Sequence, residues 1–413
     1  MTSYFSPHFF AGNRDKLRAL LTGGEIVVLT AAGTLQRSGD TTYPFSQDRN
    51  FWYVTGIDTP DVLLVLTADD EYIILPEQDD MRDVFEGVID SNALSRRSGV
   101  AKCYSQREGW DRLKSNMQGC KAVATVLPGA LRHAHGGFYL NPARKQLAER
   151  LKRTARNVDF QDVRTRIARL RSVKQPAELA AITAAVKLTT DTLNELRSAK
   201  QLGSFRYEYE LEAAISHGMR RRGAAGHAYS PIIASGPHAT TLHYIANNGK
   251  IDQNHLVVVD VGAEVENYAA DITRTLCVSE PTKRQVEVLA AVRTVQQEAL
   301  ATLKAGILLK DYEQTVTRAM GKALVGLGLS NDKDDHVTLR RYYPHATSHF
   351  LGLDVHDVGD YMSVLEPNMV ITCEPGIYIP EEGIGVRLED DVIITNTGVN
   401  NLSANCSYDA YVL

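Results

Sequence analysis

The chain has 413 residues, of which 44% are hydrophobic and 23% are charged, and its formal net charge at pH 7 is −5. These values are typical of a globular protein and exclude a disordered or fibrous one. The small negative charge does not predict binding to nucleic acid or to an anionic membrane, and no stretch of 18 apolar residues is available to cross a bilayer. At about 150 residues per domain, the length predicts two domains.

Two further features predict a reducing, cytoplasmic location. The first apolar stretch, residues 25–33, follows two glycines and lacks the basic and then apolar order of a signal peptide. The five cysteines form no CxxC pair, so we expect free thiols and no disulfide framework. Any metal site is therefore expected to use histidine and carboxylate ligands.

The first part of the chain alternates strand and helix patterns. A charged, helical pattern spans Asn141–Thr154. The apolar runs typical of buried strands are Glu25–Leu29, Val62–Leu66, Tyr72–Leu75 and Ala122–Leu127. The second and third of these runs flank an Ala-Asp-Asp turn, which predicts a hairpin. We expect a small α/β domain over residues 1–165.

From residue 166 onward, pairs of helical patterns precede pairs of strand patterns. Helices are expected from Pro176, over Glu208–Arg222 and over Thr282–Lys304. The expected strands are Leu256–Gly262, Tyr268–Val278, Met369–Glu374 and Gly385–Thr395. This order predicts an α+β domain over residues 166–413 with antiparallel pairing. Nine of the twelve histidines follow residue 176, so we expect the chemistry in this domain.

A carboxylate stands in an otherwise apolar strand at Asp260, within the run Val257-Val-Val-Asp260-Val. Aspartate is depleted in strands, and burial of an unpaired carboxylate costs free energy. A hairpin turn centred on Val265-Glu266 would place Asp260 opposite Asp271, with their Cβ atoms about 5 Å apart. Two negative charges this close require a cation or a shared proton.

A second hairpin repeats this arrangement. A turn centred on Glu381-Glu382 would place Glu374 opposite Glu389. Either carboxylate pair alone is also compatible with a salt bridge or with surface exposure. The occurrence of two such pairs in one domain favours a metal site.

Three histidines, His345, His349 and His356, lie within twelve residues. The first two have the i, i+4 spacing of a zinc-binding helix pair, but Ser348 and Gly352 disfavour a regular helix and no HExxH motif is present. A lone histidine here would be a core residue, whereas histidines beside four carboxylates favour ligation. Oxygen-rich ligation without thiolates predicts Mn²⁺ rather than Zn²⁺, and four carboxylates can neutralise two such ions.

Taken together, these motifs resemble those of the pita-bread metallopeptidases, and specifically of the aminopeptidase P family. In the second domain the resemblance rests on Leu242-His243-Tyr244, VVVDVGAE, ADITRT, SHFLGLDVHDVG, CEPGIYI and GVRLEDD. In the first domain it rests on residues 43–56, YPFSQDRNFWYVTG, which resemble the signature of the family's N-terminal domain. The resemblance covers nearly the whole chain. It implies a C-terminal pita-bread catalytic domain and a smaller N-terminal α/β domain.

Carried over position by position, the resemblance implies a complete dinuclear site. The five implied metal ligands are Asp260, Asp271, His349, Glu374 and Glu389, with Asp271 and Glu389 shared by two divalent ions. The implied substrate histidines are His243, His345 and His356, and the implied substrate-side residues are Arg387 and Tyr378. Family members are often dimers or tetramers, so we expect a homo-oligomer.

Three positions and the last residues of the chain depart from the family pattern. Ala346 stands where glycine is usual, His238 where asparagine is common and Ser46 where arginine is often found. The last residues, 406–413, do not resemble the usual ending. None of these differences removes an implied ligand. For His238 we expect a plain polar contact, or an altered rim of the pocket.

The resemblance implies release of the N-terminal residue from peptides with proline in the second position. That bond lacks an N–H, so peptidases that require this donor act on it poorly. A hydroxide that bridges the metals would attack the carbonyl, Glu374 would accept a proton, and His243 and His356 would contact the carbonyl oxygen.

Three alternatives share this fold. A prolidase would cleave only Xaa-Pro dipeptides, and the N-terminal signature favours aminopeptidase P over it. A non-catalytic module that binds peptides or proteins, or a metal-free hydrolase similar to creatinase, is opposed by the intact ligand set.

Overall fold

The computed structural model describes residues 3–78, 80–128, 140–155 and 158–411. The chain divides into two compact units, Met1–Arg171 and Ser172–Leu413. The boundary expected from the sequence, after residue 165, falls within helix α8 (Arg164–Ser172). Within the described residues, every helix is too short or too polar to cross a membrane.

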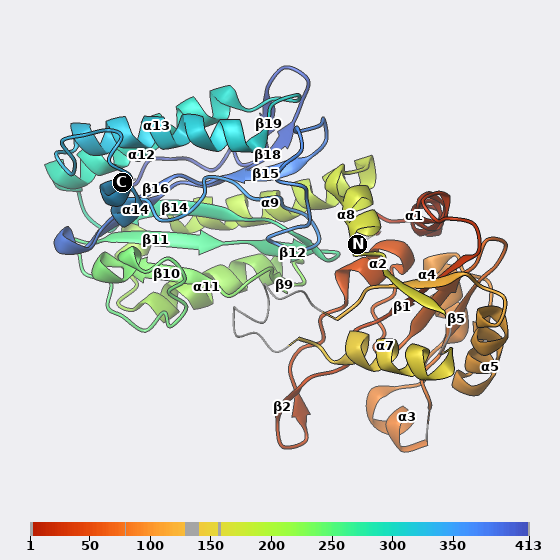
Figure 1. The fold of residues 1–413 in the computed structure, drawn as a ribbon. Coiled ribbons are helices and arrows are strands. Elements are labelled where there is room, and N and C mark those ends of the chain that lie inside the picture. Colours follow the sequence, from red (N-terminus) through yellow and green to blue (C-terminus); the bar gives the residue numbers. More distant parts are fainter. Residues whose placement is uncertain (1–2, 79, 129–139, 156–157, 412–413) are drawn as a thin grey trace. The chain divides into compact units, whose positions relative to one another are not determined.

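The N-terminal unit contains one mixed six-stranded sheet in the order β6-β5-β4-β1-β7-β8 (Figure 1). Its strands are β1 (Glu25–Thr30), β4 (Leu63–Leu66), β5 (Glu71–Ile74), β6 (Cys103–Tyr104), β7 (Ala122–Thr125) and β8 (Asp159–Asp162), and β2 (Gln36–Ser38) and β3 (Thr41–Thr42) form a separate hairpin. The other helices are α1 (Pro7–Ala19), α2 (Arg49–Thr55), α3 (Asp80–Glu86), α4 (Ser91–Ser98), α5 (Gln106–Met117) and α7 (Ala143–Thr154). The four predicted strands and the predicted helix are confirmed.

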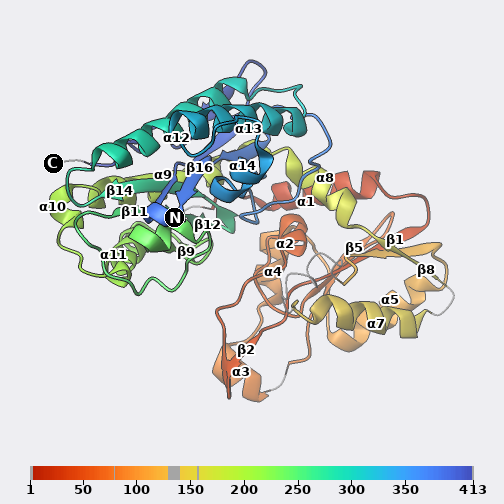
Figure 2. The same ribbon diagram turned by 60° about the vertical axis from the view of Figure 1, so that its left-hand side comes forward.

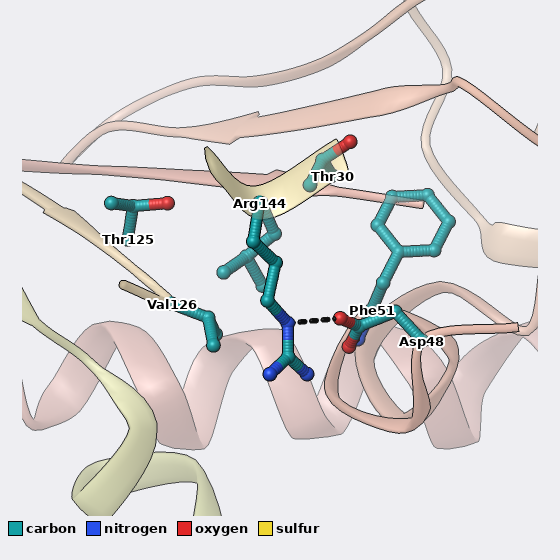
Figure 3. A pocket seen from close by; sticks show the side chains of 7 residues that line it. Thr30, Asp48, Phe51, Thr125, Val126 and Arg144 are labelled. Atoms are coloured by element: carbon teal, nitrogen blue, oxygen red, sulfur yellow. Dashed lines mark hydrogen bonds and ion pairs between the residues drawn. The ribbon is translucent and has the colours of Figure 1, made fainter. Parts of the chain in front are cut away.

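The signature at residues 43–56 builds the start and end of helix α2. Asp48 caps the helix, because its carboxylate accepts from Asn50 N at 2.9 Å and Phe51 N at 3.2 Å. The same carboxylate accepts from Arg144 Nε of α7 at 2.6 Å, beside a small pocket (Figure 3). Gly56 ends the helix with φ +65°, and a Cβ there would lie 2.3 Å from the Phe10 ring. The motif therefore stabilises the N-terminal unit.

The C-terminal unit alternates helices with antiparallel strand pairs. Its helices are α9 (Pro176–Leu196), α10 (Ala199–Leu202), α11 (Glu208–Arg221), α12 (Lys283–Thr302), α13 (Leu309–Gly326), α14 (His336–Tyr342) and the 3₁₀ turns η1 (Gly236–Thr240) and η2 (Pro380–Glu382). Its strands are β9 (Gly226–His227), β10 (Ile232–Ser235), β11 (Leu256–Val261), β12 (Ala263–Val265), β13 (Tyr268–Ala269), β14 (Ile272–Cys277), β15 (Val370–Cys373), β16 (Gly376–Ile379), β17 (Ile384–Arg387), β18 (Asp390–Ile394) and β19 (Val399–Asn401). The paired strands of this unit are all antiparallel among the described residues, as an α+β domain requires.

Helices cover the strands of this unit. Helices α12 and α13 pack together on one side of the strands, and α11 lies on the other side in both views (Figures 1 and 2). Val292 of α12, Met320 of α13, Ile371 of β15 and Val386 of β17 are buried in one shared hydrophobic core. Asp260 lies on β11, and Asp271, Glu374 and Glu389 lie directly beside the ends of β14, β15 and β18, so this core fixes the strands that position them.

The first hairpin turns at Glu266 and Asn267, whose φ angles are +46° and +68°. Two successive positive φ angles are typical of a type I′ turn, which suits the strand twist. The register places Asp260 opposite Thr273, so the predicted turn was one residue early and the predicted pairing of Asp260 with Asp271 was wrong. Asp271 lies two residues before Thr273 and therefore still shares a face with Asp260.

The second hairpin has the predicted register. Cys373 pairs with Asp390 in β15–β18, and Gly376 pairs with Arg387 in β16–β17. Both ladders share the centre between Glu381 and Glu382, where the turn η2 ends at Gly383 with φ +63°. The predicted turn is therefore confirmed. Glu374 and Glu389 lie between the two ladders, at positions that this register places opposite each other.

Candidate metal centre

The two aspartates of the first hairpin are buried and share one hydroxyl. Asp260 is 8% exposed and Asp271 is 5% exposed. Tyr229 Oη lies 2.5 Å from Asp260 Oδ1 and 2.6 Å from Asp271 Oδ1. One hydroxyl carries one proton, so it cannot donate to both carboxylates at once. The Tyr229 hydroxyl therefore cannot balance the negative charges of both Asp260 and Asp271.

His349 brings the second hairpin to the first. Its Nε2 lies 3.4 Å from Asp271 Oδ2 and 3.4 Å from Glu374 Oε1. Ligand atoms of Asp271, His349 and Glu389 all lie within 4.8 Å of one another, close enough to hold one metal ion. Together with Asp260, which shares the Tyr229 hydroxyl, the structure gathers all five predicted ligands into one cluster.

Backbone pairing with strand β15 positions His349. Its N–H donates to Thr372 Oγ1 at 3.1 Å, and Thr372 N donates to His349 O at 3.0 Å. His349 Nδ1 lies 3.0 Å from Phe350 O, so Nδ1 holds a proton and Nε2 is the nitrogen that can bind a metal ion once its own proton is lost. Helix α14 ends at Tyr342, so His345 and His349 do not form a helical zinc pair, which agrees with the doubt raised by the sequence.

The other histidines lie around this cluster. His345 Nε2 is 2.9 Å from Tyr378 Oη, and His345 Nδ1 is 2.8 Å from Ala346 O. The His356 ring is exposed and lies 4.2 Å from the His349 ring, centre to centre. His243 is exposed and close enough to His345 to disfavour the protonated form of that ring.

Arg387 lies inside the cluster. Its Nη2 donates to Asp260 Oδ2 at 2.6 Å, its Nη1 donates to Tyr378 Oη at 2.9 Å, and its Nε donates to Thr273 Oγ1 at 3.1 Å. The side chain is buried, with only 4% of the residue exposed. Arg387 therefore orients Asp260 and Tyr378 and supplies one positive charge to the carboxylates.

The carboxylates are short of positive charge without metal. Burial and the neighbouring Asp271 and Asp260 charges raise the pKa of Glu374 to about 8, against the opposing effect of His349. Burial and the charges of Asp271, Glu374 and Asp260 raise the pKa of Glu389 well above its usual value. A buried set of oxygen donors whose ionised forms repel one another is chemically suited to divalent cations.

The two inner histidines are shifted in opposite directions. Burial disfavours charged His349, but its hydrogen bond to Asp271 and the Glu374 charge raise its pKa to about 9. Burial and the Arg387 charge lower the pKa of His345 to about 4. Without metal, His349 is therefore a second cation of the cluster besides Arg387, and His345 is neutral.

Sequence reasoning missed three residues that hold the ligands. Tyr229 contacts both aspartates, and Thr273 Oγ1 donates to Glu389 Oε2 at 2.7 Å. Asp391 Oδ2 accepts from Asp271 N at 2.9 Å. Tyr229 lies far from any ligand in the sequence and carries no spacing signal. Thr273 and Asp391 lie two residues from a predicted ligand, and the period of a strand was a usable signal for both.

Known proteins resemble this chain over its whole length. Residues 180–396 match metallopeptidase family M24, and residues 10–126 match the aminopeptidase P N-terminal domain. The chain is 32% identical to the Xaa-Pro aminopeptidase of Escherichia coli K12, covering 98% of this chain and 96% of that protein. It is 33% identical to human Xaa-Pro aminopeptidase 3, covering 92% of this chain and 78% of that protein.

Solved structures give the same result. Aminopeptidase P from E. coli with the inhibitor Pro-Leu has a TM-score of 0.86 at 30% identity and covers 99% of this chain and 97% of its own. Proline aminopeptidase P II from Yersinia pestis has a TM-score of 0.85 at 28% identity, with 98% of each chain covered. These likenesses confirm the predicted pita-bread fold with its N-terminal α/β domain. The chain belongs to metallopeptidase family M24 and is a metal-dependent aminopeptidase of the aminopeptidase P type.

Proposed function

We propose that this enzyme releases the N-terminal residue from peptides that carry proline in the second position, with two Mn²⁺ ions as cofactors. The observation that carries the proposal is the cluster that four buried or half-buried carboxylates form with His349. Oxygen-rich donors with one imidazole and no thiolate suit Mn²⁺ better than Zn²⁺. Asp260, Asp271, His349, Glu374 and Glu389 would hold the two ions.

The ions, when bound, supply positive charge that acidifies water and stabilises negative charge on the reacting carbonyl oxygen. The chain's own residues then hold and move the protons. Glu374, whose carboxylate lies beside His349, accepts a proton from the attacking water and gives it to the proline nitrogen as the C–N bond breaks. His356 and His243 donate to the carbonyl oxygen, as positioned donors do in other hydrolases.

His345 and Tyr378 form the substrate side of the proposed site. They are linked at 2.9 Å, and Arg387 holds Tyr378 from behind, also at 2.9 Å. In our proposal Tyr378 and Arg387 form a wall of the proline pocket, and neutral His345 contacts the peptide. Support for a peptide substrate comes from an E. coli relative that was solved with the inhibitor Pro-Leu.

A comparison of substrates tests the function. Metal-free enzyme reloaded with Mn²⁺ should hydrolyse Xaa-Pro-Yaa peptides at least as fast as Xaa-Pro dipeptides, and should leave matched Xaa-Ala-Yaa peptides largely intact. Activity confined to dipeptides would instead make the enzyme a prolidase on the same metal site. Full activity in protein that elemental analysis finds free of metal would refute the proposed cofactor.

We also propose a cytoplasmic location and a homo-oligomer, either a dimer or a tetramer. All five cysteines are free, which fits a reducing compartment. Light scattering coupled to size-exclusion chromatography tests the oligomer, and a monomer at micromolar concentration would contradict it.

A further inference from the structure

A fully buried carboxylate lies outside the metal cluster, at the first residue of helix α11. Glu208 is 0% exposed and receives four donors. Oε1 accepts from Ser235 N at 2.8 Å and lies 3.0 Å from His238 Nδ1. Oε2 accepts from Gly249 N at 2.6 Å and from Tyr244 Oη at 2.8 Å. All four donors belong to residues 235–249, which we call the His243 loop.

Glu208 holds both ends of the His243 loop. Ser235 opens the loop and Gly249 closes it, and the Glu208 N–H donates back to Gly249 O at 3.0 Å. A Cβ at position 249 would lie 2.5 Å from the His238 ring and 2.9 Å from Glu208 Oε2, so only glycine allows this approach. Within the described parts of the chain, no lysine or arginine pairs with Glu208. The loop's own donors therefore stabilise the buried charge.

The middle of the loop is ordered by the same carboxylate. The rings of His238 and Tyr244 stack with centres 4.3 Å apart and an angle of 22° between them, and both rings bond to Glu208. Tyr244 also packs against the small core of Ile232, Ala234, Ala239 and Val258. His238 thus makes the plain polar contact that was one of the two expectations for this departure from the family pattern.

His243 precedes Tyr244 directly and is exposed, while its neighbour is fixed to Glu208. We propose that Glu208 is a positioning residue for His243. Glu208 holds the two ends of the His243 loop together, and the loop in turn holds His243 in place. This inference rests on the proposed function, in which His243 contacts the substrate carbonyl. Among the described residues, the hydrogen bonds of the Glu208 side chain all go to the His243 loop, so its effect should be confined to substrate binding and turnover.

Glu208→Gln is a sharp test because each carboxylate oxygen accepts one backbone N–H. Whichever way the amide faces, its NH₂ group meets the N–H of either Ser235 or Gly249, and neither can turn away. One end of the loop is released as a result. Glu210→Gln is the matched control, because Glu210 lies on the same helix but accepts from Arg206 N and Tyr207 N and not from residues 235–249.

The experiment compares four full-length, Mn²⁺-loaded enzymes with wild type: E208Q, H243A, the double variant and E210Q. We expect E208Q to lower kcat/KM for an Xaa-Pro-Yaa peptide by about 10- to 100-fold, the cost of a small misplacement. The double variant should be no slower than H243A alone, because Glu208 acts through His243. Mn²⁺ affinity, titrated into metal-free protein, should equal that of wild type, and E210Q should match wild type throughout.

Amide hydrogen exchange of residues 235–249 in metal-free protein gives a readout that does not depend on activity. It should be faster in E208Q than in wild type and E210Q. Losses that multiply in the double variant, or unchanged exchange in E208Q, would overturn the proposal. Normal kinetics in H243A would refute the role of His243 while the metal titration still reports on the proposed function. If E208Q does not fold, Tyr244→Phe removes one donor and should show a smaller loss that also vanishes in the H243A background.

Discussion

Glu374 and His356 both lie beside His349 but have different proposed roles. Glu374 Oε1 is 3.4 Å from His349 Nε2 among the proposed ligands, whereas His356 is exposed and its ring centre lies 4.2 Å from that of His349. We expect Glu374→Gln to lose metal and to lower kcat by about a thousandfold or more. His356→Ala should keep both ions and lower kcat by about 10²- to 10³-fold, the cost of one lost donor to the oxyanion.

Metal content and steady-state rates separate these two variants, and His336→Ala, an exposed histidine on α14, serves as control. Loss of metal in His356→Ala would make His356 a ligand and remove His349 from that role. Near-normal turnover in Glu374→Gln would place Glu374 outside the reaction.

Tyr229 offers a second test at this scale. Its hydroxyl contacts two proposed ligands, and burial raises its pKa well above 10, so it is a neutral donor. Tyr229→Phe should weaken Mn²⁺ binding by about 10- to 100-fold, as the loss of a group that orients ligands does. Tyr268→Phe is the matched control, because it also loses a buried bond to a carboxylate, that of Glu178 at 2.8 Å, and Glu178 is not a proposed ligand. Equal affinity in the two variants would contradict this prediction.

At the scale of elements, the first hairpin depends on a close approach at Gly262. A Cβ at this position would lie 1.7 Å from Ala270 O across the hairpin, next to Asp271. Gly262→Ala should therefore force the strands apart, lower the free energy of unfolding by about 3 kcal/mol or more, and weaken metal binding. Gly226→Ala meets nothing within 4 Å and should change stability by no more than about 0.5 kcal/mol. Similar unfolding curves for both variants would show that the hairpin tolerates the side chain.

The two hairpins also show how far the sequence alone predicts the site. The second turn was placed correctly, because apolar runs of similar length flank Glu381-Glu382 and Gly383 ends the turn. The first was placed one residue early, although Asn267, a residue that tolerates positive φ, was a usable signal. The period of two kept both aspartates on one face despite this error.

Contacts between distant segments were beyond sequence reasoning. The ligands carry a recognisable pattern, but Tyr229 and Glu208 are ordinary residues in ordinary surroundings until the chain folds. Their importance comes from the groups that meet them, such as the four donors on Glu208. A single sequence specifies such partners only through the complete tertiary structure.

For the whole molecule, metal removal should expose a dependence of stability on pH. The pKa of Glu374 is raised from 4.5 to about 8 and that of His349 from 6.5 to about 9, so both favour folding when protonated. The stability that Glu374 contributes is complete below pH 4.5 and is lost as the pH rises toward 8. The stability that His349 contributes is complete below pH 6.5 and is lost as the pH rises toward 9. The pKa of His345 is lowered to about 4, so this residue destabilises the folded state only below pH 6.5, outside the range considered. The Tm of metal-free protein should therefore fall between pH 6.5 and 8.

Thermal unfolding of the metal-free and Mn²⁺-loaded forms at several pH values in this range checks the prediction. The loaded form should melt at a higher temperature at every pH, because ions that bind only the folded state stabilise it. A metal-free Tm that stays constant or rises between pH 6.5 and 8 would contradict the assigned pKa shifts.

Because the metal-free cluster is protonated, binding of metal ions must release protons from it. His349 must give up its proton before Nε2 can ligate, and Glu374, with its pKa near 8, releases a fraction of a proton at neutral pH. Apparent Mn²⁺ affinity should therefore rise with pH, and the medium must take up the released acid. Calorimetric titrations at pH 7 in two buffers with different ionisation enthalpies should give different binding heats. The difference should correspond to the release of more than one proton per enzyme molecule. Equal heats in the two buffers would show that the ions enter a site already deprotonated.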